Sequence, residues 1–266
     1  MAIRVGVYDS GIGGLTTLAL LRAALPRCDF LYLADNARMP FGTKSKEEIS
    51  VAVHSAMKRL SADCDLVVMG CNTASVTVNP EGAFTLRPDI EHSDPAETLV
   101  LGTPLTLAGL QAKEKGFSTA DTGELAVLVE IRTSLSFKSK TRLGVPELSD
   151  YLELRLSPFK GIKKVLLGCS HYVYAASLIH DVLGGAVAED GNDKTVGAVC
   201  RALYGKTPIS TDVDVPSELP HDNVKFEFTG INEKAKYRWV LAQLQNTYAR
   251  NDENLQKVRK AVFFPD

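Results

Sequence analysis

Short apolar runs alternate with amphipathic stretches through the first third of the chain. The stretches at residues 3–8, 30–33 and 65–69 are almost entirely apolar, which is typical of strands buried inside a parallel sheet. Helical spacing of apolar residues follows the first two runs, at residues 15–24 and 45–60. Strands that alternate with helices in this way predict an α/β fold with a doubly wound parallel sheet.

Turn-forming residues interrupt this alternation between residues 79 and 96, where we expect a connector that crosses to a second domain. Beyond this connector, residues 151–156 have the pattern of a helix. Four further apolar runs are interpreted as strands: residues 98–101, 125–129, 164–167 and 186–188. The sequence therefore predicts a second α/β unit after the connector.

A Pro-rich and Asp-rich stretch at residues 205–223 predicts a second connector. A strand at residues 224–230 and a helix at residues 233–248 follow it, and the many charges of this helix predict a solvated face. We therefore expect the chain to divide into two domains: residues 1–96 together with 209–266, and residues 97–208.

The bulk composition narrows the class of protein. The chain has 266 residues, enough for two domains, and its 45% hydrophobic fraction and net charge of -2 give no sign of a nucleic-acid partner. No apolar run approaches the ~20 residues that span a bilayer, so we expect no membrane segment. The five cysteines form no CxxC pair, which argues against a disulfide scaffold and favours a reducing, cytoplasmic location.

Two of these cysteines occupy the same position relative to a predicted strand. Gly70-Cys71 follows the apolar run at residues 65–69, and Gly168-Cys169 follows the run at residues 164–167. Each thiol is therefore expected at the carboxyl end of a strand beside a helix start, where the pKa of a thiol falls below its free value of ~8.5. A single cysteine of this kind is more often a small core residue, but the repeated pattern favours a functional pair.

Five polar loops each follow a predicted strand, and two of them contain the cysteines. The residues singled out in these loops are Asp9, Ser10, Pro40, Phe41, Gly42, Asn72, Thr73, Thr103, Thr106, Ser170 and His171. Glu130 is interpreted as one more strand-end acid, because it ends the run at residues 125–129. The carboxyl ends of parallel strands share one edge of a sheet, so two domains that face each other would bring all these residues to one cleft.

Two thiols that face each other across a cleft can invert a carbon centre. One thiolate removes a proton while the other thiol returns a proton to the opposite face, so the reaction needs no cofactor. Donors that could stabilise the carbanion-like transition state are Ser10, Asn72, Thr73 and Thr103. Asp9, Glu130 and His171 could tune the thiols. The other histidines show no metal-ligand spacing, so we expect no metal site.

Four ordered segments resemble motifs of the glutamate racemases, in the cofactor-independent aspartate/glutamate racemase family: residues 7–15, 33–45, 71–75 and 167–172. Residues 228–230 are similar to the last strand of that family, so the resemblance spans nearly the whole chain. It implies two pseudosymmetric, doubly wound (flavodoxin-like) α/β domains with the substrate in an interdomain cleft.

The resemblance also implies roles for individual residues. Cys71 and Cys169 are the implied acid/base pair, the first acting on the D-isomer and the second on the L-isomer, with assistance from Asp9, His171 and Glu130. The residues implied to contact the amino acid are Ser10, Pro40, Phe41, Gly42, Asn72, Thr73, Thr103, Thr106 and Ser170. Phe41 stands where the family usually has Tyr, so one hydroxyl of the family's site is missing.

The expected function is therefore that of a cofactor-independent glutamate racemase. Its product would be D-glutamate for cell-wall peptidoglycan, and a homodimer is a further expectation of the resemblance. Two alternatives stay open. One is a related two-cysteine racemase or isomerase that acts on aspartate or another acid, and the other is a non-catalytic paralogue that binds an acidic amino acid. The short segments between Cys71 and Glu130 motivate the second alternative.

Overall fold

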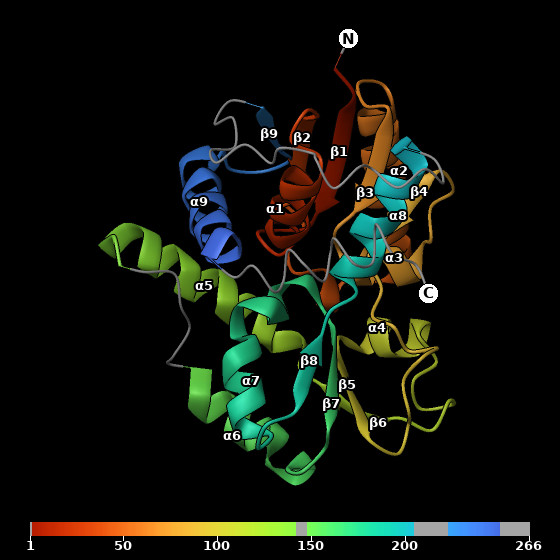
Figure 1. The fold of residues 1–266 in the computed structure, drawn as a ribbon, viewed down its shortest axis with the longest axis vertical. Coiled ribbons are helices and arrows are strands. Elements are labelled where there is room, and N and C mark those ends of the chain that lie inside the picture. The colour runs from red at the N-terminus through yellow and green to blue at the C-terminus, as the bar shows by residue number, and fades with distance from the viewer. Residues whose placement is uncertain (1, 142–147, 205–222, 251–266) are drawn as a thin grey trace.

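Two parallel β-sheets form the two halves of the molecule in the computed structural model, which describes residues 2–141, 148–204 and 223–250 (Figure 1). The first sheet has the order β4-β3-β1-β2-β9, and its strands are β1 (Arg4–Asp9), β2 (Asp29–Ala34), β3 (Leu66–Met69), β4 (Ala83–Thr85) and β9 (Val224–Phe228). The second sheet has the order β6-β5-β7-β8, and its strands are β5 (Thr98–Gly102), β6 (Ser118–Asp121), β7 (Lys164–Gly168) and β8 (Val187–Glu189). The predicted fold class, two doubly wound parallel α/β domains, is confirmed.

The two sheets repeat one order of strands. In each, the first strand in the chain lies between the second and the third, and the fourth lies outside the third. The registers pair Val7 with Val68 in the first sheet and Val100 with Leu166 in the second. Strands β3 and β7 are therefore equivalent, and both Gly-Cys corners follow this equivalent strand.

Helices cover both sheets. They are α1 (Leu15–Ala24), α2 (Lys46–Ser61), α3 (Asn72–Thr77), α4 (Pro104–Gly109), α5 (Gly123–Ser139), α6 (Ser149–Leu156), α7 (Ala176–Val182), α8 (Asn192–Tyr204) and α9 (Lys234–Arg250), with 3-10 helices η1 (Phe41–Thr43), η3 (Ser157–Phe159) and η4 (Ser170–Ala175). Helix α2 begins at a capping box, in which Ser45 Oγ accepts from the Glu48 amide at 3.2 Å and Glu48 Oε2 accepts from the Ser45 amide at 2.8 Å.

The prediction of a strand at residues 125–129 is wrong, because these residues lie inside helix α5. Leu125, Val129 and Thr133 are buried at intervals of four, and this helical spacing is hidden within residues 125–129 because residues 126–128 are also apolar. The second strand of this domain is instead β6, whose sequence Ser-Thr-Ala-Asp has no apolar run to reveal it. The connector predicted at residues 79–96 likewise contains the short strand β4.

Helix α8 packs against α1 and β4, which belong to the first domain, although it follows β8 of the second. The second predicted connector, residues 205–223, lies outside the described residues except for Asn223. The division of the chain at residues 96 and 208 stays a prediction. Within the described ranges, no helix is long and apolar enough to cross a membrane.

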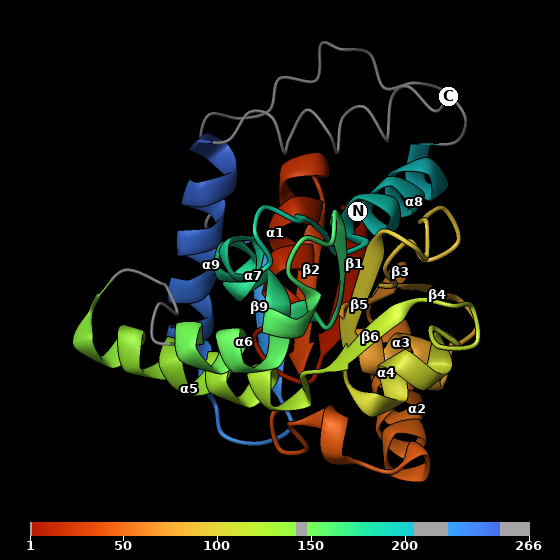
Figure 2. The same ribbon diagram turned by 90° about the horizontal axis from the view of Figure 1, so that it is seen from below.

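Helix α9 joins the two domains. It packs against α1 of the first domain and α5 of the second, and Figure 2 shows it crossing α5. The rings of Phe137 on α5 and Trp239 on α9 lie 5.8 Å apart. The prediction of a solvated face misses the inner side of this helix, where Lys236, Tyr237 and Val240 are 6%, 0% and 0% exposed.

Candidate active site

Both Gly-Cys corners are buried at the carboxyl ends of their strands. Cys71 is the N-cap of α3, directly after β3, and Cys169 precedes η4, directly after β7. Their exposed fractions are 5% and 7%. The glycines before them permit this burial, because a Cβ on Gly70 would lie 3.1 Å from Gly14 Cα and one on Gly168 would lie 2.5 Å from the Leu101 carbonyl oxygen.

The carboxyl edges of the two sheets touch each other around these corners. Ser170 Oγ donates to Asp9 Oδ2 at 2.9 Å, which links the residue beside Cys169 to the end of β1. Thr73, two residues after Cys71, lies within hydrogen-bond distance of Thr103 Oγ1 and Thr106 Oγ1 in the other domain, at 3.2 Å each. The structure therefore brings the two corners to one interface between the domains, as the sequence predicts.

Cys71 lies beside Ser10, with the two side-chain heteroatoms 3.9 Å apart. Burial raises the pKa of the Cys71 thiol above its ordinary value, and the negative charge of Asp9 adds to this effect. A hydrogen bond from the Ala74 amide, at the start of α3, opposes the rise. The Cys71 thiol is therefore protonated at neutral pH in the free protein.

Alkylation of Cys71 by iodoacetamide should consequently still accelerate with pH above ~8.5, the pKa of a free thiol. The reason is that only the thiolate reacts and that burial and Asp9 disfavour the thiolate. The rate is measured by mass spectrometry of the peptide that contains Cys71, with glutathione as the reference thiol. A rate that levels off below the pH at which glutathione levels off would contradict this assignment of the charge state.

Cys169 has a different set of partners. Its sulfur lies 3.9 Å from His171 Nδ1, and His171 Nε2 lies 3.1 Å from Glu130 Oε1. Burial by itself lowers the pKa of His171, but hydrogen bonds with Cys169 and Glu130 outweigh it and raise the pKa well above its ordinary value. His171 is therefore an imidazolium that donates to Glu130 from one nitrogen and faces Cys169 with the other.

Glu130 reaches the interface from helix α5, and not from the end of a strand as the sequence suggested. Its Oε1 also accepts from the amide of Ile12, at 2.7 Å, so it ties α5 of the second domain to the β1–α1 loop of the first. Burial raises the pKa of Glu130, but the hydrogen bond and charge of His171 outweigh burial and lower it. Glu130 is therefore a buried carboxylate with a cation beside it.

Asp9 is fully buried between the two corners. Its carboxylate accepts hydrogen bonds from the Gly11 amide, at 2.7 Å, and from Ser170. The charge of His171 also stabilises the carboxylate. Burial outweighs these contacts and raises the pKa of Asp9. Asp9 thus contacts the residue that follows Cys169 and acts on Cys71 by its charge.

The residues expected to contact an amino acid fall into two groups. Near the thiols, buried side chains from both domains contribute hydroxyl or amide groups: Ser10, Asn72, Thr73, Thr103, Thr106 and Ser170. Gly42 also touches the interface, because a Cβ there would lie 2.8 Å from Thr103 Cγ2. The other two lie less directly at the site, since the Phe41 ring packs against Tyr8 with ring centres 6.3 Å apart and Pro40 is a half-buried residue before η1.

Asn72 has one orphaned atom. Its Nδ2 donates to the Leu86 carbonyl at 3.3 Å, while its buried Oδ1 has no hydrogen-bond partner among the described residues. A buried acceptor without a partner costs roughly 1–3 kcal/mol. The amide oxygen is therefore available to a donor from a bound molecule.

Within the same described ranges, no group of three or more His, Cys, Asp or Glu side chains could hold a metal ion.

Three further side chains, which the sequence did not reveal, also shape the site. Tyr32 donates to the Gly11 carbonyl and Tyr174 to the Ile12 carbonyl, each at 2.8 Å, and both bonds hold the β1–α1 loop in place. Lys236 lies 3.5 Å from Glu130 Oε2. The tyrosines resemble ordinary core aromatics in the sequence, and the lysine stands in a charged helix, so no local pattern marks them.

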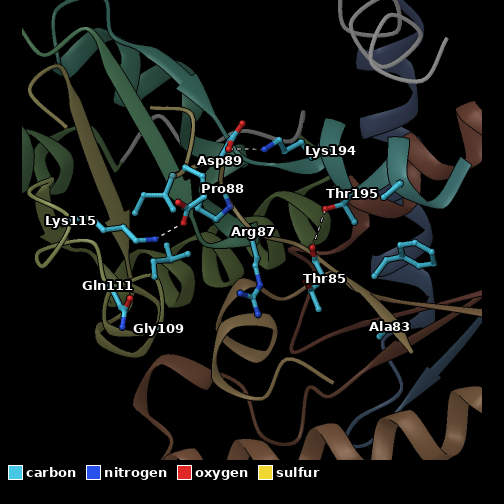
Figure 3. Close-up of a pocket in the computed structure, with 15 residues that line it drawn as sticks. Ala83, Thr85, Arg87, Pro88, Asp89, Gly109, Gln111, Lys115, Lys194 and Thr195 are labelled. Atoms are coloured by element: carbon cyan, nitrogen blue, oxygen red, sulfur yellow. Dashed lines mark hydrogen bonds and ion pairs between the residues drawn. The ribbon is translucent and has the colours of Figure 1, made fainter. Parts of the chain in front are cut away.

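A hollow of about 520 Å³ opens on another part of the molecule, between the connector after β4, the end of α4 and helix α8 (Figure 3). Its lysines are already paired, Lys115 with Glu91 at 2.5 Å and Lys194 with Asp89 at 2.6 Å. Neither thiol lines this hollow, so it is separate from the interface described above.

Comparison with known proteins identifies relatives of the chain. It is 30% identical to a glutamate racemase of Campylobacter concisus over 93% of this chain and 99% of the relative. It resembles the crystal structure of glutamate racemase from Thermus thermophilus in complex with β-chloro-D-alanine, with a TM-score of 0.66 at 25% identity, covering 91% of this chain and 93% of the other. The glutamate racemase of Francisella tularensis in complex with D-glutamate shares the fold, with a TM-score of 0.67 at 23% identity over 92% and 94% of the two chains.

No protein-family model matches the chain. The fold and its relatives nevertheless define an isomerase of the racemase class: two pseudosymmetric parallel α/β domains that meet at their carboxyl edges. More narrowly, the chain belongs to the glutamate racemase family.

Proposed function

We propose that this chain interconverts L- and D-glutamate by direct proton transfer at Cα between Cys71 and Cys169, without a cofactor. The observation that carries the proposal is the position of the two thiols. Each is buried at the equivalent corner of one domain, and the corners are joined by the contact of Ser170 with Asp9 at 2.9 Å. Two independent acid/base groups on opposite domains are what inversion of a carbon centre requires.

In the direction from D to L, the reacting form of the protein is the minor one in which Cys71 is a thiolate and Cys169 is a thiol. The Cys71 thiolate takes the Cα proton, and the electron pair of the broken C–H bond is delocalised into the substrate carboxylate. Cys169 then gives its thiol proton to the opposite face of Cα and is left as a thiolate. In the direction from L to D the two thiols exchange these roles. His171 stabilises the Cys169 thiolate from 3.9 Å, and Ser10 supports Cys71 at the same distance.

The free acceptor of Asn72 suits the α-ammonium group of an amino acid, because it is buried and has no partner among the described residues. Hydroxyl groups of Thr73, Thr103 and Thr106, together with Ser10 and Ser170, supply donors for the carboxylates. The relatives named glutamate racemase, one of them in complex with D-glutamate, support glutamate as the substrate. Pro40, Phe41 and Gly42 are proposed as the edge of the same pocket. Because both thiols are nearly fully buried, substrate exchange requires the two domains to separate.

The test is racemisation of purified protein with each of L-glutamate, D-glutamate and L-aspartate in D₂O, without added cofactor. Circular dichroism follows inversion, and mass spectrometry follows deuterium at Cα. A two-thiol mechanism labels the product at Cα while the remaining substrate is still unlabelled early in the reaction, because the returning proton comes from the second thiol. Inversion of aspartate faster than glutamate would reassign the substrate. Binding of glutamate without inversion would overturn the proposal and favour a non-catalytic paralogue.

The homodimer implied by the resemblance and the cytoplasmic location favoured by the cysteines both stay predictions.

A further inference from the structure

Helix α9 places a buried lysine at the far end of the Cys169 side of the site. Lys236 is only 6% exposed, although lysine is among the residues that are least often buried. Its Nζ lies 2.7 Å from Glu233 Oε1, 3.5 Å from Glu130 Oε2 and 3.4 Å from Ser134 Oγ. The ring of Tyr237 lies 5.4 Å from the same nitrogen. Burying an ammonium group is costly, so its position calls for a reason.

The contacts form a line that ends at a reacting atom. Lys236 Nζ contacts Glu130 Oε2, Glu130 Oε1 accepts from His171 Nε2 at 3.1 Å, and His171 Nδ1 lies 3.9 Å from Cys169 Sγ. The line passes through α9, α5 and η4, so parts of both domains contribute to it. On the other side of the interface, Cys71 has Ser10 as its side-chain partner. The arrangement of charges is therefore different for the two thiols.

The charge of Lys236 matters because the buried ion pair of His171 and Glu130 is in equilibrium with a pair in which both groups are neutral. In a low-dielectric interior, an isolated imidazolium and carboxylate can pass the proton from His171 to Glu130 and lose both charges. A second cation beside Glu130 opposes this transfer, and the positive charge of Lys236 is among the causes that lower the pKa of Glu130. Asp9 also faces His171 as a nearby charge, from β1, and Cys169 faces it from its own segment.

We propose that Lys236 is a positioning residue for the Cys169 half of the reaction: its ammonium keeps Glu130 a carboxylate, so that His171 keeps the proton that it presents to Cys169. Without Lys236, Cys169 would face a neutral imidazole, and its thiolate would lose the cation that stabilises it. Cys71 would be unaffected. The proposal rests on the two-thiol function proposed above and adds a residue from outside the motifs that led to it.

The test is a pair of substitutions, Lys236→Met and Lys236→Arg, with Lys234→Met on the exposed side of the same helix as the matched control. Because L- and D-glutamate are equally stable, kcat/KM must change by the same factor in both directions, so rates alone cannot show which thiol is affected. Deuterium isotope effects on kcat/KM can, when α-deuterated L- and D-glutamate are each used as the substrate. Each isotope effect reports the thiol that removes the proton in that direction.

Lys236→Met is expected to lower kcat/KM by roughly tenfold, less than the about 10²–10⁴-fold expected for loss of an acid or base itself, because Lys236 acts on Cys169 only through Glu130 and His171. Its isotope effect should rise with the enantiomer that Cys169 deprotonates and fall with the other, because proton transfer at Cys169 becomes the slower step. Lys236→Arg keeps the charge and should restore both isotope effects, and Lys234→Met should change neither. Isotope effects that stay as in the parent protein, or that change alike in both directions, would overturn the proposal.

Lys236→Gln replaces the methionine variant in the experiment if that variant does not fold. Its amide keeps a buried donor for Glu130 and Ser134 but carries no charge, so the same opposite changes of the two isotope effects are expected. The two proposals fail separately. A parent protein that shows no primary isotope effect in either direction, or keeps its rate without one thiol, would count against the two-thiol mechanism. A parent with both effects and a symmetrical response of Lys236→Met would count only against the role of Lys236.

Discussion

Replacing either Cys71 or Cys169 by serine is expected to reduce the rate of racemisation by about 10²–10⁴-fold in both directions, the contribution of a positioned acid or base. Both directions are affected because each thiol is the base in one direction and the acid in the other. Serine differs from cysteine only by an oxygen atom in place of sulfur, but its hydroxyl is a much weaker acid than a thiol. Serine can therefore neither hold the negative charge nor return a proton at the required rate. Circular dichroism with L- and D-glutamate measures the loss.

The two serine variants carry an internal check on folding. The thiol that remains can still remove a proton from its own enantiomer and return it to the same face, so each variant should exchange the α-hydrogen of one enantiomer with D₂O without inverting it. Cys64→Ser is the control, since Cys64 is half-buried just after α2 and its sulfur lies near Gly6 in the middle of β1. A variant that lacks either Cys71 or Cys169 and racemises at the parent rate would rule out the two-thiol mechanism.

Gly13→Ala is expected to cause the second-largest effect, a loss of about 100-fold in kcat/KM. A Cβ at Gly13 would lie 2.2 Å from Ser170 Oγ and 2.7 Å from His171 Nδ1, which belong to the other domain. One of the domains must therefore move, and a displacement of ~1 Å in an active site can cost about 10²-fold in rate. The methyl group would also separate Ser170 from Asp9, which breaks the contact that joins the two corners.

The same substitution should lower the free energy of unfolding by about 1–3 kcal/mol, the usual cost of overpacking a buried site. Denaturant unfolding measures this cost, and initial rates measure the loss of activity. Gly123→Ala is the matched control, because a Cβ at Gly123 would meet Asp121 Oδ1 at an ordinary 3.4 Å. Parent-like activity of Gly13→Ala would mean that the domains tolerate a wider separation than the contacts at Ser170 and His171 indicate.

The sequence predicts the strands that lead into the thiols because those strands are buried on both faces and read as continuous apolar runs, as in Val165-Leu166-Leu167 of β7. The same rule fails at residues 125–129, where an apolar run lies inside helix α5, and at β6, where a short edge strand has no apolar run. Local pattern cannot separate these cases, since burial on one helical face depends on what packs against it.

Glu130 shows the same limit at the site. The sequence places it among the functional acids by resemblance and assigns it to a strand end, but its carboxylate reaches the interface from a helix and accepts from Ile12, 118 positions away in the chain. Lys236 is still harder to find, because a lysine in a charged helix has the pattern of a solvated residue. Only the packing of α9 between α1 and α5 buries it beside Glu130.

By itself the sequence determines the doubly wound class of fold, the two equivalent Gly-Cys corners and the family, because buried strands and short motifs can be recognised from a few neighbouring residues. The tertiary structure alone decides which charges face each thiol. His171 lies beside Cys169 and is followed by Glu130 and Lys236, while Ser10 and the charge of Asp9 act on Cys71. This asymmetry arises from contacts between two domains and a final helix far apart in the chain, and electrostatic interactions depend on distance in space, not on separation in sequence.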